Sequence, residues 1–243
     1  MPPPTARRRS ISVGSVTAGV LLSPFLLASV PALALFDLVR GRRRLPAARL
    51  ATFGVWYLWW EAAAVVSATA LWIAAGFGRG LGSAGSVRCH RALQDAWVAS
   101  LLRVARRVLG LRLEIEGADL LGHGPLIVLC RHASLLDTLI PARLLFDRGL
   151  AVRYVLKDEL LWDPALDIIG HRLPNYFVDR DSPDPVAETA AIGALAAGAG
   201  TDEALVIFPE GTRWSPEKRT RAIESLRSSS PERAARAEAN HHT

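Results

Sequence analysis

The chain has 243 residues, half of them hydrophobic, and a formal net charge of +6 at pH 7. This length fits one domain with an appendage, and the basic balance fits an anionic partner such as phospholipid or an acidic cofactor. No nucleic-acid-binding motif accompanies the charge, so a nucleic-acid partner is not expected. Only two cysteines are present, which excludes a disulfide framework and gives no metal-ligand spacing.

Two long apolar stretches occupy the N-terminal part of the chain. Residues 11–36 contain no charged side chain, and a run of about 20 apolar residues is long enough to cross a bilayer. Pro24 and Pro31 interrupt this run and should bend any helix there. A second apolar stretch covers residues 50–78. The pattern predicts a membrane-anchoring hairpin of two helices over residues 1–80.

The placement of arginine leaves the topology of this anchor open. Residues 7–9 are arginines that precede the first stretch, and further arginines lie between the stretches at positions 40–49. Two complete crossings would put one basic cluster on the non-cytoplasmic side, against the positive-inside tendency. A hairpin that enters only one leaflet keeps both clusters on the cytoplasmic face. We expect a membrane protein whose following domain lies on the cytoplasmic face.

Three features of the anchor have competing interpretations. The aromatic cluster at residues 56–60 is typical of an interfacial belt. Glu61, the only charge in the second stretch, fits a shallow hairpin, or it could pair with a nearby arginine. Residues 32–34 resemble the cleavage site of a signal peptide, but the length of the first stretch and the presence of a second one disfavour that interpretation.

A glycine- and serine-rich segment at residues 78–86 predicts a flexible linker. Residues 88–109 then predict a helix with one apolar face, which contains Trp97 and Leu101. Arginines at positions 103, 106 and 107 fall on another face of this helix. The helix either lies on anionic lipid or packs on the domain with a solvated basic face.

From residue 111 the pattern changes to strands that alternate with helices. Residues 111–116 alternate apolar and charged side chains, as a half-exposed strand does, whereas residues 126–130 form a continuous apolar strand. Further strands are expected at residues 152–156, 176–178 and 204–208, and helices at residues 134–145 and 185–197. The alternation predicts an α/β domain over residues 81–213, with a mostly parallel sheet flanked by helices. Active sites in such sheets usually form at the carboxyl ends of strands.

A histidine and an aspartate follow the expected strand at residues 126–130. His132 and Asp137 are separated by four residues. A positioned imidazole can take the proton of a hydroxyl, a step typically worth about 10²–10⁴ in rate. A carboxylate bonded to the other ring nitrogen fixes the tautomer of the imidazole. The pair therefore fits a general base with its orienting acid, or alternatively a helix-capping pair.

The expected strand at residues 204–208 runs into a second motif, Phe-Pro-Glu-Gly-Thr-Arg. Gly211 permits a tight turn, and Arg213 can donate paired hydrogen bonds to a phosphate. Glu210 can hold that arginine or accept a hydrogen bond from a substrate hydroxyl. The alternative is a strand-ending turn with a surface ion pair. Lys157, at the end of another expected strand, is a weaker candidate for the same anion, or a solvated surface lysine.

The two motifs, in this order, resemble those of the glycerolipid acyltransferase family, whose best-known members are the 1-acyl-glycerol-3-phosphate acyltransferases. His132 and Asp137 match the family's His-x4-Asp block, and residues 208–213 match its Phe-Pro-Glu-Gly-Thr-Arg block in full. A further block of the family ends in a phosphate-binding arginine, which corresponds to Arg180. The resemblance extends over residues 88–213, and the N-terminal hairpin is similar to membrane-docking helices of the family.

The resemblance implies an acyltransferase of phospholipid biosynthesis. It would move a fatty acyl group from an acyl thioester, on coenzyme A or acyl carrier protein, to the free hydroxyl of lysophosphatidic acid, making phosphatidic acid. His132 would be the general base and Asp137 would orient it, without a cofactor, a metal ion or an acyl-enzyme. The residues implied to bind the phosphate and glycerol of the acceptor are Arg180, Glu210, Gly211, Thr212 and Arg213, with Lys157 as a further candidate.

The sequence departs from the family pattern in two places. Pro174 stands where the family usually has glycine, and no counterpart of the family's fourth block, an apolar strand around a proline, follows Arg213. Residues 214–243 read instead as a polar tail, with a short helix expected from Pro231. We therefore expect a C-terminally short domain with an exposed strand edge. The alternatives are an acyltransferase for another lysophospholipid and a truncated, inactive membrane lipid-binding relative.

Overall fold

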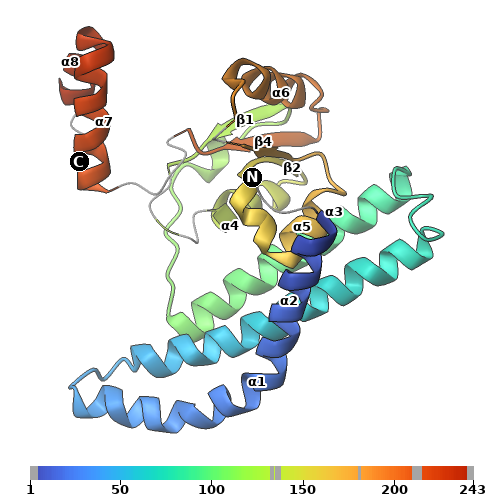
Figure 1. The fold of residues 1–243 in the computed structure, drawn as a ribbon, viewed down its shortest axis with the longest axis vertical. Helices are drawn as coiled ribbons and strands as arrows, with labels where there is room; N and C mark the ends of the chain where they lie inside the picture. Colours follow the sequence, from blue (N-terminus) through green and yellow to red (C-terminus); the bar gives the residue numbers. More distant parts are fainter. Residues whose placement is uncertain (1–4, 132–133, 135–137, 180–181, 210–214, 240–243) are drawn as a thin grey trace.

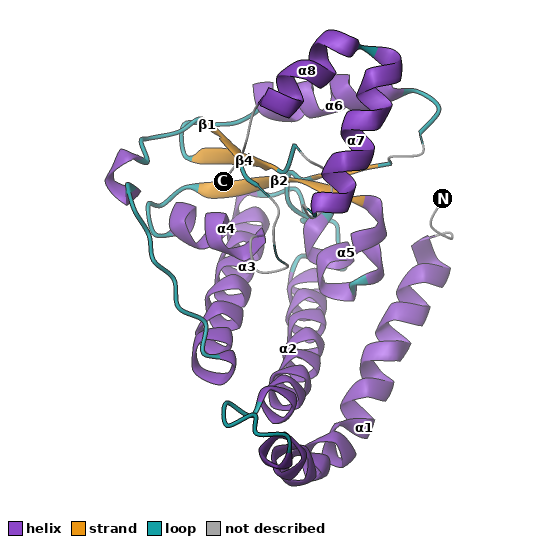
Figure 2. Ribbon diagram, turned by 90° about the vertical axis from the view of Figure 1, so that its left-hand side faces the viewer, coloured by secondary structure: helices purple, strands orange, loops and turns teal. Residues whose placement is uncertain are grey.

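The structure, a computed structural model, describes residues 5–131, 134, 138–179, 182–209 and 215–239. A small sheet lies between helix α6 on one face and a group of helices on the other, and the N-terminal helices extend beyond that group (Figure 1, Figure 2). The longer helices are α1 (Thr5–Val39), α2 (Pro46–Ala74), α3 (Ala84–Val104), α4 (Leu139–Phe146), α5 (Pro164–Gly170), α6 (Pro185–Ala197), α7 (Pro216–Ser229) and α8 (Pro231–Ala239). Short helical turns are η1 (Ala105–Leu109), η2 (Ala118–Leu120) and η4 (Asp158–Trp162).

Four parallel strands form the sheet, in the order β1-β4-β2-β3. The strands are β1 (Leu126–Leu129), β2 (Ala151–Lys157), β3 (Tyr176–Val178) and β4 (Glu203–Ile207). Strand β4 pairs with both β1 and β2, and Ala204, Leu205 and Val206 are at most 1% exposed because helices cover both faces of this central strand. The predicted α/β class with a parallel sheet is confirmed.

The main hydrophobic core lies between the sheet and helices α3 and α4. Val98 and Leu102 on α3, and Leu145 on α4, pack against Val152 of β2 and Val206 of β4. The apolar face expected on the first helix of the domain therefore covers the sheet, while its arginines at positions 103, 106 and 107 are exposed. The packing on the domain that the sequence allowed is thus confirmed.

One expected strand and two expected boundaries are wrong. The helix expected over residues 134–145 begins at Leu139. Residues 111–116 form an extended connection instead of a strand, and Ile115 is 49% exposed. Alternating apolar and charged side chains indicate one buried and one exposed face, but a strand also needs a hydrogen-bonded neighbour, and this segment has none among the described residues. The expected linker at residues 78–86 ends early, because Ser83 caps α3 by accepting a hydrogen bond from the backbone N–H of Ser86 at 3.2 Å.

The two N-terminal helices pack against each other as a hairpin. Helix α1 runs through Pro24 and Pro31 and bends along its length (Figure 1). Asp37 at its end is fully buried and accepts hydrogen bonds from the backbone N–H groups of Ala47 and Ala48 at 2.8 and 3.2 Å, which caps α2. Both helices are long and apolar enough to cross a membrane, and only 6% and 17% of their most apolar segments is buried within the protein. This exposure is compatible with the expected membrane anchor.

The aromatic cluster at the start of α2 divides between two environments. Trp56 and Tyr57 pack against the main core, and Trp56 stacks on Trp60 with 5.5 Å between ring centroids. Trp59 is 55% exposed and donates a hydrogen bond to Ser23 of α1. Helix α2 therefore turns part of the cluster toward the domain, and the interfacial belt stays a prediction.

The C-terminal helices α7 and α8 pair with each other and stand apart from the sheet (Figure 1). Their contact buries Ile223 and Ala234, and Arg227 pairs with Glu238 at 2.6 Å. The short helix expected from Pro231 is confirmed as α8. Among the described residues strand β1 is at the edge of the sheet, and Ile127 and Leu129 are 62% and 68% exposed, so the face of β1 that carries these side chains is uncovered.

Candidate active site

The segments that carry the two motifs leave adjacent strands at the same edge of the sheet. Leu129 at the end of β1 pairs with Ile207 at the end of β4, and the N–H of Cys130 donates to the carbonyl of Ile207 at 2.9 Å. Neighbouring strands lie about 4.8 Å apart. His132 comes two residues after Cys130, and Glu210 comes three residues after β4. The two motifs therefore depart from neighbouring points on the carboxyl edge, where active sites of parallel sheets form.

Most of the predicted site residues lie outside the described residues, and their roles stay predictions: His132, Asp137, Arg180, Glu210, Gly211, Thr212 and Arg213. Lys157 is described, as the last residue of β2, and it pairs with Val178 of β3. The sheet places β3 three strands from β1. The segment that carries Arg180 therefore leaves the same edge of the sheet about 14 Å from the segment that carries His132.

An apolar cavity of about 690 Å³ lies at this carboxyl edge. Its walls combine strand ends, such as Leu156 and Ile207, with residues of α3, α4 and α5. Thr138 and Pro209, the residues directly beside the two motif segments, are part of its lining, and so is Lys157. Cavities of this size and apolar character are typical of sites that enclose a small organic ligand. The cavity can therefore hold an apolar group next to both motifs.

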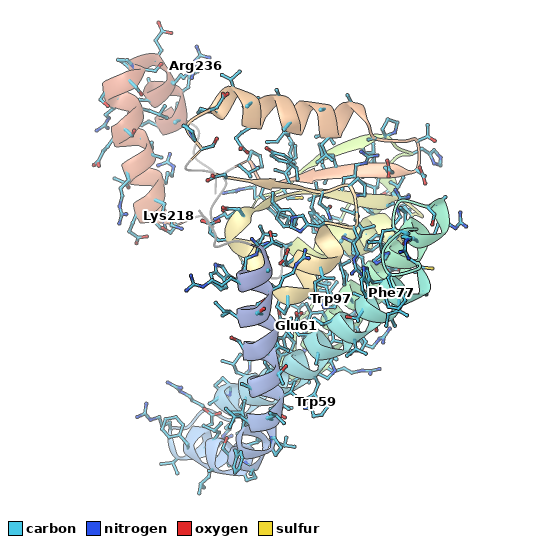
Figure 3. The ribbon with its side chains drawn as sticks, turned by 45° about the vertical axis from the view of Figure 1, so that its right-hand side comes forward. Trp59, Glu61, Phe77, Trp97, Lys218 and Arg236 are labelled. Carbon is cyan, nitrogen blue, oxygen red and sulfur yellow. The ribbon has the colours of Figure 1, made fainter. Side chains whose placement is uncertain are left out.

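Two polar atoms in the cavity wall have no hydrogen-bond partner among the described residues. They are the side-chain oxygen of Gln94 and the indole nitrogen of Trp97, both on α3. Glu61 of α2 is 2% exposed, and its carboxylate lies beside Tyr57 and Asp163 without a hydrogen bond of full geometry among the described residues. Figure 3 places Glu61 and Trp97 in the packed helices below the sheet. The expected pairing of Glu61 with an arginine is therefore not found in the part of the chain that the structure describes.

Tyr154 connects the middle of the sheet to the start of α4. Its hydroxyl donates a hydrogen bond to the carbonyl oxygen of Thr138 at 2.7 Å, and its backbone N–H donates to the side-chain oxygen of Asn175 at 2.8 Å. Asn175 in turn donates to the carbonyl of Gly170 at 3.0 Å. Burial raises the pKa of the Tyr154 phenol, so the group stays protonated and remains a hydrogen-bond donor.

Helix α5 forms one wall of the cavity and is also the place where the anchor meets the domain. Tyr57 of α2 donates to Asp163 at 2.7 Å, and Asp163 caps α5 by accepting from the N–H of Leu166. Asp167 is completely buried and pairs with Arg8 and Arg9 of α1, each at 3.0 Å. Arg8 and Arg9, two residues of the first basic cluster, thus bind the α/β domain itself.

Arg172, just after α5, also links the domain to helix α2 and contacts α3. Its guanidinium donates to the carbonyl of Ala68 on α2 at 2.6 Å and lies 3.1 Å from Nε2 of His90 on α3. His90 is fully buried, and its Nδ1 lies 2.8 Å from the carbonyl oxygen of Ser86. A neutral imidazole with its proton on Nδ1 satisfies both contacts, because Nδ1 then donates to Ser86 and Nε2 accepts from Arg172.

Sequence reasoning missed the cavity, Tyr154 and the α5 junction. Tyr154 sits inside a strand whose apolar pattern explains it as a core residue, and Asp167 looks like an ordinary polar residue of a short helix. The Asp163-Pro164 pair is a recognisable helix start, but it does not reveal what the helix contacts. Among the described residues no group of three His, Cys, Asp or Glu side chains is placed to hold a metal ion.

A family model described as Acyltransferase matches residues 112–230, which include all four strands and both motif segments. No solved structure matches the chain. The matched region begins shortly before the sheet and contains its whole carboxyl edge. The chain belongs to the acyltransferase family, and residues 112–230 are its acyltransferase domain.

Proposed function

We propose that this acyltransferase moves a fatty acyl group from a thioester of coenzyme A or acyl carrier protein to the free hydroxyl of lysophosphatidic acid, making phosphatidic acid in phospholipid biosynthesis. The observation that carries the proposal is the pairing of β1 with β4, because it brings the His132 and Glu210 segments to one edge of the sheet. The apolar cavity beside both segments supports a substrate with a long hydrocarbon part.

The proposed chemistry is a direct transfer with a general base and no cofactor. His132 takes the proton of the acceptor hydroxyl as its oxygen attacks the thioester carbonyl. Asp137 orients the imidazole and stabilises the imidazolium. When the tetrahedral intermediate collapses, the carbon–sulfur bond breaks and the proton passes to the departing thiolate. The net products are the ester and the free thiol.

The acceptor's phosphate requires cationic groups at the same edge of the sheet. Arg213 follows β4 and Arg180 follows β3, and a guanidinium can bind phosphate through two hydrogen bonds. Glu210, Gly211 and Thr212 complete the proposed acceptor site, and Lys157 at the end of β2 contributes a further positive charge.

We propose that helices α1 and α2 hold the enzyme on the cytoplasmic face of a membrane without two full crossings. Tyr57, in the middle of α2, bonds to Asp163 of the domain, and Arg8 at the start of α1 bonds to Asp167. A helix whose middle contacts the catalytic domain cannot be surrounded by hydrocarbon on all sides. A hairpin that enters one leaflet satisfies these contacts and leaves the exposed apolar side chains of α1 for lipid.

The deciding experiment measures release of free thiol by the purified full-length protein in lipid vesicles. Acyl-CoA and acyl carrier protein serve as donors, with lysophosphatidic acid, glycerol-3-phosphate and other lysophospholipids as acceptors. His132→Ala should abolish transfer, whereas His123→Ala, which changes an exposed histidine outside the motifs, should leave it unchanged. Turnover that survives His132→Ala would remove the proposed base.

The acceptor panel also separates the alternatives. Preference for a different lysophospholipid would keep the mechanism and change the product. Binding of lysophosphatidic acid without any turnover would support an inactive lipid-binding relative, an alternative that the exposed edge of β1 makes worth testing.

A further inference from the structure

In the part of the chain that the structure describes, the hydroxyl of Tyr154 has one hydrogen bond, to the backbone of Thr138. Tyr154 lies on β2 and pairs with Val206 of the central strand β4. Its side chain belongs to the main core, with 7% of the residue exposed, and the hydroxyl lies 2.7 Å from the carbonyl oxygen of Thr138. Buried polar groups are held by their partners, so this bond fixes one backbone atom of Thr138 relative to the sheet.

Thr138 lies in the chain between Asp137, a proposed catalytic residue, and helix α4. It directly follows Asp137 and directly precedes α4, which begins at Leu139. Its side chain does not cap the helix. The helix is otherwise attached to the domain through apolar packing, with Leu139 and Ala142 buried against the core, and through the ion pair of Arg143, in its second turn, with Asp95 of α3 at 2.6 Å. Apolar packing is not directional, whereas a hydrogen bond to a carbonyl sets both distance and direction.

We propose that Tyr154 is a positioning residue for acyl transfer, which holds Thr138, the residue that directly follows Asp137 in the chain. The inference rests on the proposed function, in which Asp137 orients His132. Tyr154 acts from the sheet and does not itself exchange protons with the substrate. Because β2 and β4 are paired at Tyr154, the bond ties the start of α4 to the strand that leads into the second motif.

The substitution Tyr154→Phe tests the role, because it removes only the hydroxyl and keeps the ring that lines the cavity. Tyr176→Phe is the matched control: the hydroxyl of Tyr176 donates to Glu188 at 3.1 Å, on the side of the sheet covered by α6. Both variants lose one phenolic hydrogen bond. Small displacements of a catalytic group can cost up to about 10²-fold in rate. We expect kcat to fall about 10- to 100-fold in Tyr154→Phe, with KM for the acyl donor within about twofold.

The pH profile separates positioning from general destabilisation. A carboxylate near an imidazole raises the pKa of the imidazole, and a displaced carboxylate raises it less. The general base must be unprotonated, so the acidic limb of the kcat/KM profile should move to lower pH in Tyr154→Phe and stay in place in Tyr176→Phe. Thermal unfolding measured in parallel shows whether both proteins are folded at the assay temperature.

Replacement of Tyr154 by 3-fluorotyrosine gives a second test that does not depend on how well the Phe variant folds. The fluorinated phenol still donates to Thr138, so kcat and the acidic limb should match the unsubstituted enzyme. An unchanged kcat and pH profile in folded Tyr154→Phe would overturn the positioning role alone. So would a fluorotyrosine protein that is as slow as the Phe variant. An unsubstituted enzyme that fails to transfer any acyl thioester would instead refute the proposed function, and this role with it.

Discussion

The buried ion pair between α1 and α5 gives a quantitative test of how the anchor is held. Asp167 is fully buried, and Arg8, whose side chain is 5% exposed, is its most buried partner. Arg9 and His171 also contact this carboxylate, but their side chains are 41% and 44% exposed. Asp167→Asn removes the negative charge, keeps the shape, and leaves Arg8 without its counter-charge.

The expected loss follows from burial. Breaking a buried pair by removing one partner costs about 3–5 kcal/mol, whereas an exposed pair contributes about 0–1 kcal/mol. We assign the loss to the Arg8 pair, discount the two exposed partners, and expect about 3 kcal/mol because asparagine can still accept a hydrogen bond. For a protein of this size each kcal/mol shifts the unfolding midpoint by about 2–4 °C, which gives a decrease of about 6–12 °C.

The assay is thermal unfolding of the full-length protein in detergent, followed by circular dichroism, with Asp202→Asn as the matched control. Asp202 also faces an arginine, Arg91, but at 3.7 Å and with 70% of its side chain exposed, so its loss should shift the midpoint by no more than a few degrees. Equal, small decreases of the unfolding midpoint in the two variants would refute the claim that a buried ion pair holds α1 against α5.

The pH dependence of the same pair provides an independent check. Burial by itself would raise the pKa of Asp167, but hydrogen bonds from Arg9 and Arg8 outweigh it and hold the pKa below its usual value. A carboxyl group with a depressed folded-state pKa stabilises the protein above its unfolded pKa of about 3.9. This stabilisation should disappear as the pH falls through the lower folded pKa, and it should be missing from Asp167→Asn.

Three further predictions concern the rest of the junction and the cavity. Burial lowers the pKa of His90; the hydrogen bond with the Ser86 carbonyl opposes this shift and the charge of Arg172 reinforces it. The folded state therefore binds fewer protons than the unfolded state below about pH 6.5, and the unfolding midpoint should fall as the pH is lowered from 8 to 5. His90→Gln should reduce this dependence of the midpoint on pH. Asp37→Ala removes the cap of α2 and should lower stability by about 1 kcal/mol in denaturant unfolding, where an unchanged midpoint would contradict the capping role. Leu166→Trp narrows the cavity and should shift the preferred donor toward shorter acyl chains in an acyl-CoA panel, while an unaltered chain-length profile would place the acyl group elsewhere.

The strands and the main helices were predictable because their signals are local. The apolar run before Cys130 and the Ala-rich segment from Pro185 gave β1 and α6 with nearly correct bounds. The strand expected at residues 111–116 is wrong because a local alternation of side chains is not enough to form a strand. A strand also needs a hydrogen-bonded neighbour, and the described part of the sheet does not supply one. Parallel pairing of strands separated by helices then follows from the order of elements.

The sequence by itself determined the family resemblance, the α/β class and the points in the chain where both motifs begin, since periodicity, turn residues and motif letters are all read along the chain. Only the tertiary structure decided that β4 lies between β1 and β2, that Arg8 reaches Asp167 across 159 positions, and that Tyr154 holds Thr138. The physical reason is that a buried hydrogen bond or ion pair depends on which surfaces meet after packing. A polar residue's partner is therefore set by the whole fold, while its type is already visible in the sequence.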